Sequence, residues 1–394
     1  MTMVSFALLL AALALAAWIY LTLFHGRFWH ADQRLPPATR EPETWPEVVA
    51  IVPARNEADL VGQAVASLLN QDYAGPLSII LVDDRSSDGT TEAVLDAIRT
   101  RNAKARLAIV PGQPLPHGWA GKVWAMAQGL EWAASDVPHA RYILFTDADV
   151  GHAQGAVRHL VAKAEAEELD LVSLMVRLEC ESGWERLLVP AFVFFFQKLY
   201  PFPRVNRPAS SMAGAAGGTM LARRAALERI GGMSAIRDAV IDDCALARAI
   251  KARGAIWLGL ADATRSLRSY EGLDDIWRMV ARSAFTQLRH SWLLLAATVI
   301  FMPVLYIVPP VMAFAGLAMG DPWVTAIGFA GWLLMMLCYL PTLRHYGRPT
   351  WEAALLPASG FLYTLMTIDS ARSHLRGEGG NWKGRTYSAP ARSH

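Results

Sequence analysis

Apolar positions follow two different patterns along this chain. Long, charge-free runs occupy residues 4–24, 293–319 and 323–343, and each is long enough to cross a lipid bilayer. From Glu47 onward, short apolar runs alternate instead with stretches of helical periodicity, which is typical of a parallel β-sheet covered by helices. The sequence therefore predicts an α/β domain with transmembrane helices on its N-terminal and C-terminal sides.

Acidic residues follow three of the predicted strands. Glu57 comes after the first strand, Asp83 and Asp84 after the second, and Asp147 and Asp149 after the last. Because ligands of open α/β sheets bind beyond the carboxyl ends of the strands, we expect these acids to line one site. The predicted strands are residues 48–52, 77–82, 106–110 and 142–145, and the predicted helices lie near 60–69, 91–101 and 123–134.

The spacing of Asp147 and Asp149 indicates a metal site. Side chains two positions apart leave a strand on the same face, so both carboxylates can reach one ligand. A hard divalent cation that grips a diphosphate needs only one or two protein carboxylates. We therefore expect Mg²⁺ or Mn²⁺ here, although an aspartate at a strand-to-helix turn can also be a simple helix cap.

Composition and charge limit the other functions open to the protein. Charged residues make up only 18% of the chain and the formal net charge is +2, so nothing indicates a nucleic-acid partner. The three cysteines are scattered without metal or redox spacing. Arginines follow the first apolar run, and the positive-inside rule therefore puts the α/β domain in the cytosol.

The predicted domain organisation follows from these patterns. The run at 353–368 is barely long enough to cross a bilayer and is expected to be re-entrant or interfacial. The expected parts are an anchor at 1–30, a linker at 31–46, a cytosolic domain at 47–290, two transmembrane helices at 291–345, and the interfacial segment with a basic cytosolic tail at 346–394.

Four motifs resemble those of family 2 glycosyltransferases with the GT-A fold. They are Pro-Ala-Arg-Asn-Glu at 53–57, Val-Asp-Asp to Asp-Gly-Thr at 82–90, Thr-Asp-Ala-Asp at 146–149, and Ile-Asp-Asp-Cys at 241–244. Their order and spacing make the match specific. The resemblance implies a nucleotide-diphospho-sugar transferase domain with a Rossmann-like, mostly parallel sheet.

The membrane segments and two further motifs narrow the resemblance. Gln-Lys-Leu-Tyr-Pro at 197–201 and Trp-Lys-Gly-Arg-Thr-Tyr at 382–387 make the chain similar to the hopanoid-associated glycosyltransferases and, more distantly, to the ceramide glucosyltransferases. This branch implies a bacterial cytoplasmic membrane and a lipid acceptor. Gln287, Arg289 and Trp292 depart from the Gln-x-x-Arg-Trp spacing of processive synthases, which favours a single transfer.

The resemblance also implies roles for individual residues. Asp149 is the expected metal ligand, Asp147 contacts the metal or the ribose, and Asp84 accepts a hydrogen bond from uracil. Asp243, with Asp242 beside it, is the expected general base, although either acid could instead cap the following helix. A single base implies one in-line displacement and hence inversion. The expected nucleotide-sugar site comprises Pro53, Arg55, Asn56, Glu57, Asp83, Asp84, Lys122 and Asp147.

Some residues and segments allow either a structural or a functional interpretation. Lys122 follows a glycine-containing turn at a predicted helix start, which suits an anion such as the diphosphate, but it could be a surface lysine. The apolar stretch 187–196 could be core, and its position favours a face that dips into the bilayer. A helix at 274–288 would align Arg278, Arg282 and Arg289 for lipid headgroups, a diphosphate or solvent. His152 lies three residues after Asp149 and could be a ligand there, but it is expected to be a loop histidine without a function.

The resulting prediction is an inverting transfer of sugar from a nucleotide-sugar, expected to be a UDP-sugar, to a membrane lipid, expected to be a hopanoid. A sphingolipid, a glycerolipid or a polyprenyl phosphate are alternative acceptors. A GT-A-like nucleotidyltransferase is a second enzyme class with the same arrangement of strands and acids. A transporter or scaffold is disfavoured by the few spans and the large cytosolic domain.

Overall fold

The computed structural model describes residues 3–36, 41–99, 106–377, 381–383 and 385–386. The chain forms two compact units. The helical unit comprises Met1–Asp32, Cys180–Pro203 and Tyr270–Gly379, and the sheet unit comprises Gln33–Glu179, Arg204–Ser269 and Gly380–His394. Two segments of the predicted 47–290 domain, Cys180–Pro203 and the chain from Tyr270 onward, thus group with the helical unit.

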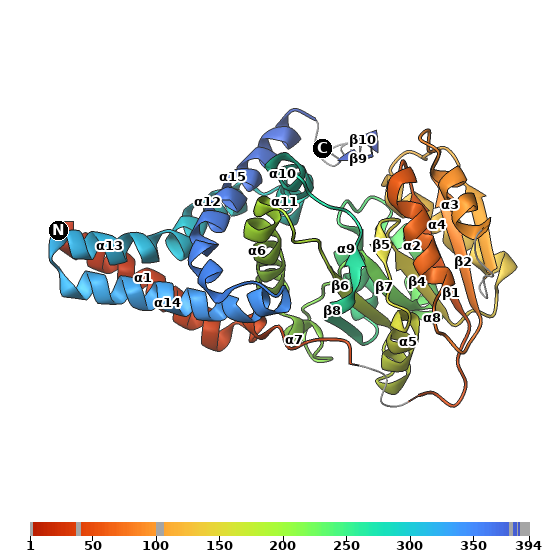
Figure 1. Ribbon diagram of the computed structural model, residues 1–394, viewed down its shortest axis with the longest axis horizontal. Helices are drawn as coiled ribbons and strands as arrows, with labels where there is room; N and C mark the ends of the chain where they lie inside the picture. Colours follow the sequence, from red (N-terminus) through yellow and green to blue (C-terminus); the bar gives the residue numbers. More distant parts are fainter. Residues whose placement is uncertain (1–2, 37–40, 100–105, 378–380, 384, 387–394) are drawn as a thin grey trace. The chain divides into compact units, whose positions relative to one another are not determined.

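The sheet unit is built on an eight-stranded sheet with the strand order β3-β2-β1-β4-β7-β6-β8-β5 (Figure 1). The pairs β1–β2, β2–β3, β1–β4 and β6–β8 are parallel, whereas β4–β7, β6–β7 and β5–β8 are antiparallel. The α/β class with a mostly parallel sheet is therefore confirmed. The strands are β1 (Val48–Ala54), β2 (Leu77–Asp83), β3 (Arg106–Pro111), β4 (Tyr142–Thr146), β5 (Val150–Gly151), β6 (Leu171–Arg177), β7 (Thr219–Arg223) and β8 (Ile256–Ser266).

Helices cover both faces of this sheet, as the continuous apolar runs of its central strands require, since consecutive residues of β1, β2 and β4 are buried. Val48, Ala50 and Val52 of β1 belong to a core formed with α2, α3 and α5. Ile51 points to the other face, where Gly129 of α4 lets the helix approach: a Cβ there would lie 2.5 Å from the Ile51 side chain. The helices are α2 (Ala58–Leu69), α3 (Thr90–Arg99), α4 (Gly121–Asp136), α5 (Ala156–Ala166), α8 (Arg224–Arg229), the 3₁₀ helix η2 (Gly232–Ile236) and α9 (Asp242–Lys251).

The four predicted strands begin at the residues expected and run one or two residues further. The predicted linker contacts the sheet unit, since Arg34 bridges to Leu260 of β8 and pairs with Asp262 at 2.7 Å. Residues 37–40 of that linker lie outside the described residues. The same holds for residues 384 and 387 of the tail motif.

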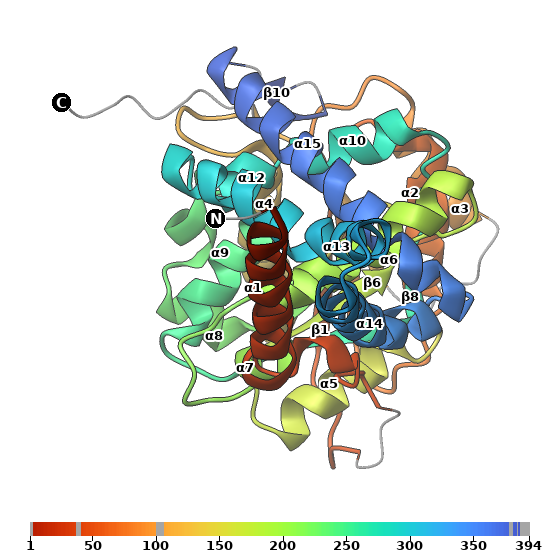
Figure 2. The same ribbon diagram turned by 90° about the vertical axis from the view of Figure 1, so that its left-hand side faces the viewer.

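The helical unit contains the candidate membrane spans. α1 (Met3–Phe24) and α14 (Pro322–His345) are each long and apolar enough to cross a membrane. α12 (Trp292–Tyr306) and α13 (Val308–Met319) form a pair bent by 49°, close to the prolines predicted to kink this segment. Figures 1 and 2 show α13 and α14 side by side. This unit also contains η1 (Phe28–His30), η3 (Thr350–Leu355) and α15 (Leu356–Leu375), while the short helix α7 (Phe202–Val205) includes residues of both units.

The stretch 187–196 lies within one helix, α6 (Gly183–Leu199), whose N-terminus carries a capping box between Ser182 and Glu185. Leu188, Phe194 and Phe195 are buried in the main core of the helical unit. The core interpretation, left open by the sequence, therefore holds for this face of α6.

The single helix predicted at 274–288 is wrong. The chain forms α10 (Leu273–Ala281) and α11 (Ala284–Gln287), because Ser283 leaves the helical conformation and Phe285 turns into the interior, where its amide donates to Ser370 Oγ. Arg289 follows the end of α11 with φ 53°. The three arginines therefore do not share one helical face.

Candidate active site

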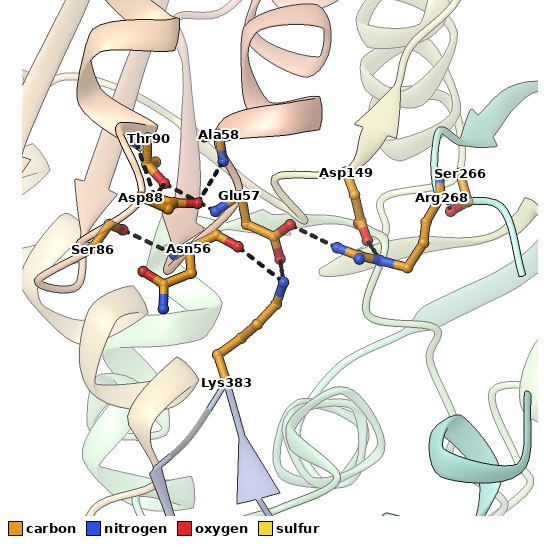
Figure 3. A network of polar contacts seen from close by, with 10 residues as sticks. All are labelled: Asn56, Glu57, Ala58, Ser86, Asp88, Thr90, Asp149, Ser266, Arg268 and Lys383. Carbon is orange, nitrogen blue, oxygen red and sulfur yellow. Dashed lines mark hydrogen bonds and ion pairs between the residues drawn. The ribbon is translucent and has the colours of Figure 1, made fainter. Parts of the chain in front are cut away.

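The loop after β1 and the loop after β2 are bonded to each other. Asn56 has φ 50°, its amide donates to Ser86 Oγ, and its Oδ1 accepts the amide of Ser87. The amides of Glu57 and Ala58 donate to Thr90 Oγ1 and Asp88 Oδ2 (Figure 3). These bonds join two of the predicted motifs into one wall at the carboxyl edge of the sheet.

Asp83 and Asp84 have different surroundings. Both oxygens of Asp83 are engaged by the residues that follow it, the Ser86 amide at 2.9 Å in the loop and Thr91 Oγ1 at 2.6 Å in the first turn of α3. Asp83 therefore shapes the loop. Asp84 is fully buried, and Arg55 Nη1 lies 4.0 Å from its Oδ2 and donates to its carbonyl oxygen at 2.6 Å. Arg55 thus ties the first motif to the acid predicted to contact the base.

Lys122 connects two acidic motifs that are distant in the sequence. Its Nζ lies 2.8 Å from Asp147 Oδ1 and 3.3 Å from Asp242 Oδ2. Its side chain is only 18% exposed, so the surface-lysine alternative is wrong. Burial alone would lower the pKa of Lys122, but the carboxylates of Asp147 and Asp242 outweigh burial and raise it above its usual range. Lys122 is therefore a fixed cation at the start of α4.

Asp243 is the better exposed member of the pair at the start of α9. Its Oδ2 accepts the amide of Gly217 at 2.8 Å, and its Oδ1 accepts the amide of Cys244 at 2.6 Å. The second bond goes to the next residue within the first turn of α9. The N-cap of α9 is Ile241 and no side chain caps this helix, so the alternative that Asp242 or Asp243 is only a helix cap is wrong. Burial and the neighbouring charge of Asp242 raise the pKa of Asp243 to about 6.

Gly217 lets Lys122 and Asp243 approach the same stretch of backbone. A Cβ at this position would lie 3.2 Å from Lys122 Nζ and 3.4 Å from Asp243 Oδ2. Any larger residue would press on both charged groups. The glycine-rich segment before β7 therefore belongs to the acidic site.

Asp149 meets a residue that the sequence did not single out. β5 pairs with β8, Val150 opposite Ser266, and this pairing brings Arg268 beside Asp149. Arg268 Nε lies 2.8 Å from Asp149 Oδ2, and its Nη2 lies 2.6 Å from Glu57 Oε2 (Figure 3). Arg268 belongs to none of the sequence motifs, and only the pairing of β5 with β8 identifies it as a residue of this site.

The donor set at Asp147 and Asp149 fits a hard divalent cation. Carboxylate oxygens are the ligands such a cation prefers, and two suffice when a diphosphate and water complete its shell. Among the described residues, no group of three or more His, Cys, Asp or Glu could hold a metal by itself. The site thus suits a cation that arrives with a phosphate ligand.

His152 has a structural role. It is buried, its ring Nε2 lies 2.8 Å from Thr146 Oγ1, and its amide donates to Ser67 Oγ. Burial lowers the pKa of His152 to about 4, so the ring is neutral at physiological pH. It supports the end of β4, immediately before Asp147.

A mostly parallel sheet with acids along its carboxyl edge is the architecture of GT-A glycosyltransferases. Residues 49–231 match the family described as glycosyl transferase family 2. The chain therefore carries a family 2 glycosyltransferase domain, which confirms the predicted enzyme class at the level of this domain.

Two known proteins are similar to this chain. An N-acetylglucosaminyltransferase of Mesorhizobium japonicum (strain LMG 29417 / CECT 9101 / MAFF 303099) is 38% identical over 65 residues, which are 16% of this chain. The chain thus matches only 15% of that relative's length. The mannosyltransferase PcManGT from Pyrobaculum calidifontis, solved with GDP-Man and Mn²⁺, superposes with a TM-score of 0.53 at 21% identity, covering 94% of this chain and 98% of the other.

Proposed function

We propose that the protein is an inverting glycosyltransferase that moves a sugar from a nucleotide-sugar, in the first instance a UDP-sugar, to a hydroxyl group of a membrane lipid. The main support is Asp243. The residue is half-buried, its carboxylate is held by hydrogen bonds, and its pKa is raised to about 6. Such a group is ionised at neutral pH yet basic enough to accept a proton as the new bond forms.

Other residues bind different parts of the nucleotide-sugar donor. Asp84 and the loop at 53–57 bind the nucleoside, and Asp147 and Asp149 hold a divalent cation, Mg²⁺ or Mn²⁺, which when bound neutralises the charge of the departing diphosphate. Lys122 keeps Asp147 and Asp242 in place and leaves Asp243 as the group that takes the acceptor proton. Displacement of the nucleoside diphosphate by the activated hydroxyl in one step inverts the anomeric carbon.

A lipid acceptor is proposed because the glycosyltransferase domain and the candidate spans belong to one chain. Within that proposal a hopanoid is the first candidate. Sphingolipids, glycerolipids and polyprenyl phosphates are the alternatives. The positive-inside pattern supports a cytosolic sheet unit, where nucleotide-sugars are available, and the membrane we propose is a bacterial cytoplasmic membrane.

The purified protein tests this directly. It is incubated with Mn²⁺, one of UDP-glucose, UDP-N-acetylglucosamine or GDP-mannose, and one lipid from each acceptor class, and nucleoside diphosphate release is followed together with the glycolipid product. We expect release that depends on the lipid and a product of inverted configuration. Consumption of free nucleoside triphosphates without any turnover of nucleotide-sugars would favour a nucleotidyltransferase instead.

A further inference from the structure

A lysine from the C-terminal tail lies against the first motif loop. The strands β9 (Asn381–Trp382) and β10 (Arg385–Thr386) pair antiparallel, with Trp382 opposite Arg385, so Lys383 falls in the turn between them. Lys383 has φ 48°, in the left-handed region that Asn and Gly usually occupy in such turns. The backbone conformation of this turn favours Asn or Gly over Lys, so the presence of a lysine needs another explanation.

The contacts of Lys383 do account for it. Its Nζ lies 2.9 Å from Glu57 Oε1 and donates to the carbonyl oxygen of Asn56 at 3.1 Å. Its own carbonyl oxygen accepts Arg55 Nε at 3.1 Å. Lys383 thus contacts three consecutive residues of the loop, and Figure 3 shows Lys383 and Arg268 converging on the Glu57 carboxylate.

These contacts continue to both sides of the donor site. On the nucleoside side, the Arg55 guanidinium donates hydrogen bonds to two carbonyl oxygens, that of Lys383 in the tail and that of Asp84. On the metal side, Lys383, Glu57, Arg268 and Asp149 form a row of alternating charges. The Glu57 side chain is only 12% exposed, so its charge depends on these two cations.

We propose that Lys383 is a positioning residue of the donor site, through which the C-terminal hairpin holds the side that receives the metal and the diphosphate. This inference rests on the proposed function. Arg268 is shared by Glu57 and Asp149, so the position of Arg268 depends on how well Glu57 is neutralised elsewhere. Without the Lys383 ammonium, Arg268 is drawn toward Glu57 and away from Asp149. Asp149 then loses the partner that orients it for the incoming cation.

The variant Lys383→Met tests the nucleoside side and the diphosphate side of the donor site separately. Methionine keeps the length of the side chain and leaves the backbone carbonyl that Arg55 contacts, but it removes both ammonium contacts. We expect the dissociation constant for the nucleoside diphosphate with Mn²⁺ to rise about tenfold, the order expected for charge-assisted hydrogen bonds at a partly exposed site. Binding of the matching nucleoside without phosphates is expected to change much less, because the bonds that join this loop to Ser86, Ser87 and Thr90 remain. Lys383→Arg keeps the charge and is expected to restore most of the affinity.

The experiment uses the full chain. UDP and GDP are titrated into the wild-type protein by calorimetry with Mn²⁺, and the tighter one, with its nucleoside, is then used for the variants. Lys163→Met is the matched control, because Lys163 pairs with Glu167 in the same unit, away from the donor loops. Hydrogen exchange of the tail at 381–386 is followed in parallel, and nucleotide is expected to slow it.

Each outcome has a distinct meaning. A wild-type protein that binds neither UDP nor GDP would refute the proposed function itself. Wild-type-like diphosphate affinity in Lys383→Met, or equal weakening of nucleoside and diphosphate, would overturn the role of Lys383 and leave the proposed function intact. If bound nucleotide leaves the hydrogen exchange of residues 381–386 unchanged, the role of Lys383 is likewise overturned and the proposed function stays intact. Selective weakening of the diphosphate with rescue by Lys383→Arg supports it.

Discussion

Replacing Asp243 by asparagine removes the proposed base, and the structure shows that this exchange has two consequences. Asparagine cannot take the acceptor proton, so turnover is expected to fall by a factor of about 10² to 10⁴. The carboxylate also accepts two backbone amides, those of Gly217 and Cys244, whereas an asparagine side chain has one oxygen to offer. One amide therefore loses its acceptor, which costs about 1–3 kcal/mol of folding free energy.

The two effects can be measured apart. Stability is followed by thermal unfolding in detergent, nucleotide affinity by calorimetry, and turnover across a range of pH. Nucleotide affinity is expected to stay within about threefold, a change of well under 1 kcal/mol, because Asp243 contacts neither the nucleoside loops nor Asp149. Asp242→Asn is the control, since Asp242 is buried against Lys122 and is not the accessible acid.

The pH profile identifies the base. The wild-type rate is expected to fall about tenfold per unit below pH 6, because a base with a pKa raised to about 6 becomes protonated there. Asp243→Asn should lose this acidic limb. Near-normal turnover in Asp243→Asn, or a profile that keeps its limb near pH 6, would refute the assignment, and loss in Asp242→Asn alone would move the base by one residue.

Three other predictions follow from the site and the spans. Asp149→Ala should abolish transfer and weaken nucleoside diphosphate binding mainly when Mn²⁺ or Mg²⁺ is present, and undiminished metal-dependent turnover would contradict the metal site. Lys122→Met should destabilise the fold by about 3 kcal/mol, because it leaves the buried Asp242 carboxylate and the half-buried Asp147 carboxylate without their cation; adding Asp242→Asn should recover part of that loss in thermal unfolding. Cysteine labelling of intact cells should reach position 321 and not position 85, and the reverse result would invert the topology.

The sequence by itself determined the strands, most helices and the identity of the acids. A short apolar run marks a strand that helices cover on both faces, so β1, β2, β3 and β4 could be located to within two residues. An acid directly after a strand must lie at the edge of the sheet, and this fixed Asp84, Asp147 and Asp149 as candidates. These features depend on neighbours in the chain, which is why they can be read without a structure.

Tertiary structure decided how the charges are paired. Lys122 meets Asp147 and Asp242 because α4, β4 and α9 converge at Gly217, and Arg268 meets Asp149, 119 residues away, through the β5–β8 pairing. Lys383 reaches Asn56 across 327 residues. Such pairs depend on how distant loops close against one another. No local pattern encodes that closure, because a charged residue outside a motif looks the same in the sequence whether it faces solvent or a buried partner.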